Sequence, residues 1–139
     1  MHAFNQSYWG NSLRFFNEGM AEYYENITID GVIPPFDFTW IQHQQYPKQV
    51  STLLFTNTDW HGDTRYEQYQ NSKALFYFLM SSLQGKNVIV EIMKKEMEDP
   101  CHALPNSTIE ALLFELFPNH QQAFDYWFRD GVTAFLNQN

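Results

Sequence analysis

Apolar residues recur along most of this chain at the spacing of helices, three or four positions apart. The strongest pattern runs from Thr64 or Arg65 to about Gln84, and Gly85 is expected to end that helix. The apolar face of this segment consists of Tyr69, Leu75, Phe76, Leu79 and Leu83. A helix with such a face buries it against a protein core.

The segments before this helix are shorter and less regular. Residues 2–9 are compatible with a helix, and Ser12 is a suitable N-cap for a helix that runs to about Asn26. Residues 27–33 alternate isoleucines around Asp30-Gly31, which predicts a short β-hairpin. Two short helices are expected over residues 36–46 and 47–55, the second with Pro47 at its first position.

The segments after Gly85 are again helical. Residues 87–99 predict a helix that stops before Pro100. Residues 106–117 predict another, capped by one of the first three residues. Residues 119–138 predict either one last helix or a helix pair that breaks at Gly131. The chain therefore predicts a mainly α fold, a helical bundle in a single domain over residues 1–139, with at most one short β-hairpin.

Composition and charge narrow the classes of partner. The chain has 139 residues, 18% of them aromatic, and a net charge of −8. Its size allows a real core, and its acidity makes nucleic acid a poor partner. The longest apolar run, residues 74–80, is too short for membrane insertion, and Cys101 has no second cysteine with which to form an internal disulfide.

A row of carboxylates distinguishes the helix that follows Ser12. Glu18, Glu22 and Glu25 lie on one stripe, and Gly19 sits beside the first of them inside the helix. Like charges one turn apart repel weakly, and a glycine within a helix costs about 1 kcal/mol. Either the stripe faces water as a solvated acidic face, or a positive group lies opposite Glu18.

Residues 16–23, "FNEGMAEY", resemble the glutamate-bearing helix of thermolysin-like zinc peptidases, the gluzincins of the peptidase-MA clan. Those enzymes carry His-Glu-x-x-His on one helix, and often Trp-Leu-Asn-Glu-Gly-x-Ala-x-Tyr on the next. A second resemblance is to a Tyr-x-x-Ser-x-x-Phe/Leu helix in several bacterial peptidase-MA-like families, matched here by Tyr69, Ser72, Leu75 and Phe78. Together the resemblances cover about residues 2–26 and 64–84.

The resemblance implies roles for particular residues. Glu18 would be a zinc ligand, and Glu22 would orient a ligand histidine from one turn away. Tyr69, or Tyr66 one turn earlier, would donate a hydrogen bond to the oxyanion of the tetrahedral intermediate. His2 lies where the family has the second histidine of its motif, which makes it a metal-ligand candidate.

The sequence departs from the family at one decisive point, because no His-Glu-x-x-His occurs in the 139 residues. The resemblance therefore implies the C-terminal half of a metallopeptidase domain, a fragment of a longer domain that is cut just before His2. On that interpretation zinc and peptide hydrolysis belong to the full-length protein, and this chain alone is inactive.

The other hypothesis is a non-catalytic helical module, a degenerate relative of the peptidases, that binds a protein partner through its aromatic surface. Under it Glu18 and Glu22 are a solvated face, and Tyr69 is a core aromatic.

The loop "DWHGD" at residues 59–63 is more simply a turn than a metal site. If a missing half normally covers this unit, an exposed apolar surface would let the isolated chain form a homodimer.

Overall fold

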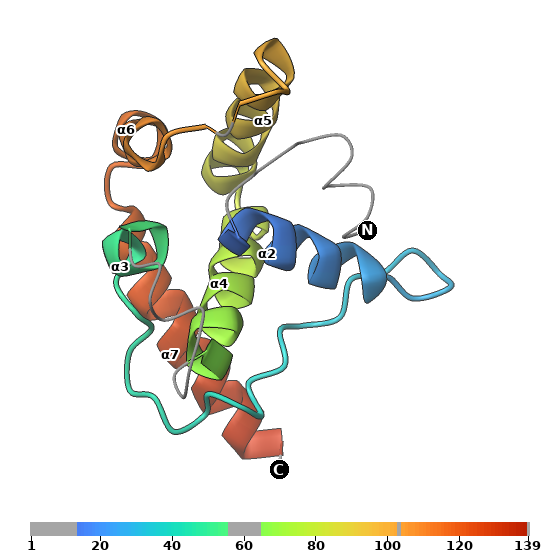
Figure 1. Cartoon of the computed structure of the whole chain (residues 1–139). Helices are drawn as coiled ribbons and strands as arrows, with labels where there is room; N and C mark the ends of the chain where they lie inside the picture. The colour runs from blue at the N-terminus through green and yellow to red at the C-terminus, as the bar shows by residue number, and fades with distance from the viewer. Residues whose placement is uncertain (1–13, 56–64, 103, 139) are drawn as a thin grey trace.

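A computed structural model describes residues 14–55, 65–102 and 104–138 (Figure 1). Within them the chain forms six helices and no strand. The helices are α2 (Arg14–Glu25), α3 (Val50–Phe55), α4 (Arg65–Met80), α5 (Leu83–Glu98), α6 (Asn106–Leu116) and α7 (His120–Gln138). The predicted mainly α fold is confirmed. None of the helices in these three ranges is both long and apolar enough to cross a membrane.

Helix α4 is the centre of the fold. Figure 1 shows α2 lying across it, α7 running beside it and α5 extending from its end, and α4 contacts α2, α3, α5 and α7. All residues from Ala74 to Leu79 are buried, so the C-terminal half of α4 is covered on every side. A helix that is apolar all round is one that neighbours enclose completely.

Helix α2 packs on α4 through Gly19. A Cβ built at Gly19 would lie 2.8 Å from Cγ of Phe76 and closer still to its Cβ, so no larger residue fits there without a shift. One turn to either side, Phe16 packs edge-on against Phe76 at 5.8 Å, and Tyr23 against Tyr77 at 5.0 Å between ring centroids. The glycine within the helix is therefore a packing requirement of α4.

The segment before α3 is not the helix that its sequence predicts. Residues 36–38 have no regular structure, turns follow over residues 39–43, and α3 begins at Val50 rather than at Pro47. The reason is that Phe36 and Phe38 are both buried, which requires an extended period of two. Phe38 packs edge-on against Phe128 at 5.4 Å, and the Asp37 carboxylate accepts the Thr39 N–H at 2.9 Å in an Asx turn.

The predicted hairpin reduces to its turn. The Gly31 N–H donates to the Thr28 carbonyl and the Thr28 N–H to the Val32 carbonyl, both at 2.9 Å, and Gly31 has a φ of 78°. No strand extends on either side of this turn within residues 27–38. Ile29 is fully exposed, so the alternating isoleucines gain no burial that would hold two strands together.

Three predicted helix ends also differ. Gly85 does not end α4 but lies in the first turn of α5, where its N–H donates to the N-cap Ser82 Oγ at 3.1 Å. Pro105 occupies the N-cap position of α6, and the side chain of Asn106 donates instead to the Leu54 carbonyl. Helix α7 continues through Gly131, and the glycine is there because a Cβ would collide with the ring of Phe38.

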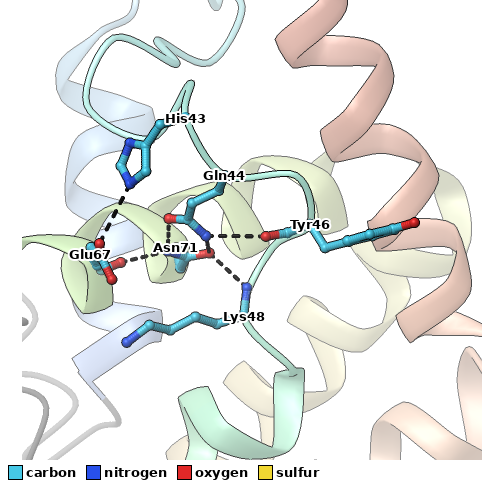
Figure 2. Close-up of polar contacts among 6 residues, drawn as sticks. All are labelled: His43, Gln44, Tyr46, Lys48, Glu67 and Asn71. Atoms are coloured by element: carbon cyan, nitrogen blue, oxygen red, sulfur yellow. Dashed lines mark hydrogen bonds and ion pairs between the residues drawn. The ribbon is translucent and has the colours of Figure 1, made fainter.

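A buried amide pair holds the loop before α3 on α4 (Figure 2). Asn71, fully buried, donates to the Gln44 Oε1 at 2.9 Å and to the Glu67 carbonyl at 2.7 Å. Its Oδ1 accepts the Lys48 N–H at 2.9 Å and the Gln44 Nε2 at 3.3 Å. Every polar valence of the Asn71 amide is thus used, and the loop takes its position from α4.

The contact at Gly19 determines whether Gly19→Ala stabilises or destabilises the protein. Gly19→Ala should lower the free energy of unfolding by about 2 kcal/mol, because the added methyl collides with Phe76. Without that contact, alanine would stabilise a helix interior by about 1 kcal/mol relative to glycine. Urea denaturation of the variant and the wild type measures the difference, and a stabilised variant would contradict the packing.

Replacing the buried amide should be costly. Asn71→Leu should lower the free energy of unfolding by about 3 kcal/mol, because the Gln44 side chain and the Lys48 N–H both lose the hydrogen bonds that they make with Asn71. Asn87→Leu, at an exposed position of α5, is the matched control and should change stability by less than about 0.5 kcal/mol. Equal effects of the two substitutions in thermal or urea denaturation would argue against the network.

Candidate functional site

Helix α2 carries the two carboxylates of the predicted site beside α4. Glu18 and Glu22 lie one turn apart, and both are half-buried, whereas Glu25 is exposed. The Glu22 carboxylate accepts a hydrogen bond from Asn26 Nδ2 at 3.1 Å and lies 3.6 Å from the Lys73 ammonium of α4. At Glu22, therefore, the stripe faces a positive group of the chain itself.

The candidate tyrosines lie on the first two turns of α4. Tyr69 is half-buried, one turn before Lys73. Tyr66 is 67% exposed, with the Arg65 guanidinium 5.0 Å above its ring and donating to its hydroxyl. Burial separates the two: Tyr69 belongs to the packed part of α4, and Tyr66 faces outward.

Of the two predicted metal ligands, His2 and Glu18, the structure describes only Glu18. His2 and the loop at residues 59–63 lie outside the described residues. The parts of the chain that are described contain no group of three or more His, Cys, Asp and Glu residues that could hold a metal ion. Glu18 can supply one carboxylate oxygen, a ligand type that zinc accepts, and zinc in a catalytic site takes three protein ligands.

Helix α4 buries two polar side chains whose burial the sequence analysis did not predict. Ser72 and Gln68 are fully buried, and neither Ser72 Oγ nor Gln68 Nε2 has a hydrogen-bond partner among the described residues. The Gln68 Oε1 accepts from the Lys48 ammonium at 3.2 Å. Unsatisfied buried polar atoms are uncommon in native proteins and often mark functional positions. Ser72 is the serine of the Tyr-x-x-Ser pattern, which was the one available signal.

A pocket of about 380 Å³ opens beside Glu22. Residues from α2, α4 and the connecting segment 34–40 line it: Glu22, Asn26, Pro34, Pro35, Phe36, Asp37, Trp40, Gln70, Lys73 and Tyr77. Periodicity within each helix cannot find this pocket, because its walls come from segments that only the α2–α4 packing brings together. An exposed tryptophan in a Pro- and Asp-containing segment was the one local signal.

The phenol of Tyr77 stays neutral in this pocket. Burial raises the pKa of Tyr77 above its ordinary value, the hydrogen bond from Asn26 opposes that shift, and the nearby charge of Glu22 adds to it. Asn26 Nδ2 donates to both the Tyr77 hydroxyl and the Glu22 carboxylate, at 3.2 and 3.1 Å. One amide therefore links the two polar groups of the pocket wall.

Glu96 is a buried carboxylate that lies away from the contact between α2 and α4. It lies on α5, is 1% exposed, and one of its oxygens has no hydrogen-bond partner. Burial raises the pKa of Glu96, and a hydrogen bond from the Leu104 backbone opposes the shift. This contact ties the segment between α5 and α6 to α5, which is a structural role.

Comparison of the chain with protein-family models, with curated proteins and with solved structures gave no match. The resemblance to the gluzincins consequently remains a prediction, and the arguments for it are those of the residues themselves.

The raised pKa of Glu96 predicts a pH dependence of stability. Because the folded-state pKa exceeds the unfolded one, the folded protein binds the proton more tightly. The stability that this gives is complete below about pH 4.5 and is lost as the pH rises through the folded pKa. Glu96→Gln should remove that loss while keeping an oxygen acceptor for Leu104.

Denaturation midpoints from pH 4 to pH 8 measure the difference between Glu96→Gln and the wild type. We expect the wild type to lose stability relative to the variant as the pH rises. Glu98→Gln, at an exposed position on the same helix, should show a flat difference. A flat difference for Glu96→Gln as well would contradict the pKa shift.

Proposed function

We propose that this chain forms the C-terminal, helical half of a zinc-dependent peptidase domain. The observation that carries the proposal is that the two segments resembling the gluzincins are α2 and α4, and that they pack directly on each other. The glycine of the Asn-Glu-Gly motif lies at their contact, against Phe76. In this arrangement Glu18 is held on a helix whose position α4 determines.

The roles of the residues follow from this arrangement. Glu18 would give a carboxylate oxygen to zinc, together with His2 and residues upstream. Zinc, when bound, would supply a polarised water for attack on a peptide carbonyl. Glu22, held by Asn26 and Lys73, would orient a neighbouring ligand, and the hydroxyl of Tyr69 would donate to the developing oxyanion.

The second candidate is a non-catalytic helical module that binds a protein partner. Two exposed aromatic side chains favour it, since Trp40 is 69% exposed and Tyr66 67% exposed. Exposed tryptophan and tyrosine are enriched at protein interfaces. Zinc content separates the two candidates, because the module needs no metal.

The direct test is the zinc content and peptidase activity of the full-length native protein. We expect one zinc per chain in the wild type, loss of zinc and activity in Glu18→Ala, and an affinity for zinc lower by about 10- to 100-fold in Glu22→Gln. Glu115→Ala, at an exposed position of α6, should retain both. A wild-type protein without zinc, or a Glu18→Ala variant that keeps it, would refute the proposal.

A further inference from the structure

The pocket beside Glu22 has an acidic and aromatic wall that packing alone does not explain. The side chain of Lys73 is 19% exposed, and its ammonium lies 3.6 Å from Glu22, so these two charges offset each other. Among the described lining residues, Asp37 is then the charge without a counter-charge. It lies at the exposed side, in a protein whose net charge is −8. The pocket should therefore attract a cation.

Asp37 has an oxygen to offer. Its Oδ1 accepts both the N–H and the hydroxyl of Thr39, at 2.9 and 2.5 Å. These bonds fix the carboxylate to the backbone, and no bond from a described residue to the other oxygen is observed. A carboxylate that is exposed at a pocket and held in place through one oxygen is a preorganised acceptor for a charged donor.

Trp40 gives the pocket an exposed aromatic side. Its side chain is 69% exposed although it lies next to the core residues Phe38 and Ile41. Tryptophan is the best aromatic partner for a cation, and a guanidinium group stacks on it through its flat face. The half-buried Gln70 lines both this pocket and a second hollow beside Trp40.

We propose that this pocket binds the arginine side chain of a peptide or protein. The guanidinium stacks on Trp40 and donates to the free oxygen of Asp37, and the volume of about 380 Å³ suits a side chain with part of its backbone. Arginine fits better than lysine because its planar group can stack and bond at the same time. The inference requires neither zinc nor peptide hydrolysis, so it stands or falls independently of the proposed function.

The test uses the metal-free full chain and two blocked tripeptides, acetyl-Gly-Arg-Gly-amide and its citrulline counterpart, which has the same shape without the charge. Chemical-shift titration of the tryptophan indole N–H signals reports binding at each tryptophan separately. We expect saturable binding of the arginine peptide that moves the Trp40 signal, and affinity for the citrulline peptide at least about tenfold weaker.

Two variants and one control locate the site. Asp37→Asn keeps an oxygen for the Thr39 turn but removes the charge, and it should weaken arginine binding about tenfold. Trp40→Ala should abolish it. Tyr126→Ala removes an aromatic that is 58% exposed on α7, outside the pocket, and should leave binding unchanged. The proposal would be overturned if the two peptides bound with equal affinity or if Trp40→Ala bound the arginine peptide as the wild type does. It would also be overturned if no saturable binding occurred at millimolar peptide.

Discussion

The close contact between Gly19 and Phe76 is the constraint on which the arrangement of the site depends. It lets α2 lie directly on α4, so that the side chains one turn to either side meet across the contact. Phe16 then covers Phe76, and Glu22 reaches Lys73. Any residue larger than glycine would lift α2 away and separate these pairs, because packed interiors do not absorb an extra methyl group without cost.

The two halves of helix α4 bury different kinds of side chain. Its C-terminal half, residues 74–79, is buried among aromatic side chains of the connecting segment and α7. Its N-terminal half buries amides and a hydroxyl instead, at Gln68, Asn71 and Ser72. A buried amide needs specific partners, so this half fixes the loop that leads into α3. Apolar packing thus gives the core, and polar pairing gives the position of the loops.

The sequence predicts the long helices well because each carries its own apolar period. The C-terminal ends of α2 and α5, Glu25 and Glu98, fall close to the predicted positions, whereas α5 begins at Leu83, earlier than predicted. The segment over residues 36–46 was misread as a helix, because the burial of Phe36 and Phe38 depends on α7, which is distant in sequence. Gly85 was misread as a helix end for a similar reason: it lies close to the backbone of Leu79 in a tight turn between α4 and α5.

Some residues of the candidate site can likewise be predicted from the sequence, and others cannot. The sequence indicates Glu18, Glu22 and Tyr69 through a local motif, and the structure places all three on two helices that pack together. Lys73, Asp37 and Trp40 meet around one pocket only in the folded chain, so no spacing in the sequence relates them. The motif does not predict that Lys73 is the counter-charge of Glu22, because that pairing depends on how α2 crosses α4.

The most direct test of this account is a nuclear Overhauser measurement between α2 and α4 in solution. We expect strong cross-peaks from the Gly19 α-protons to the β-protons and ring of Phe76, with the α-protons shifted by the ring current. Gly19 α-protons that show contacts only within their own helix would contradict the packing on which both the site and the pocket depend.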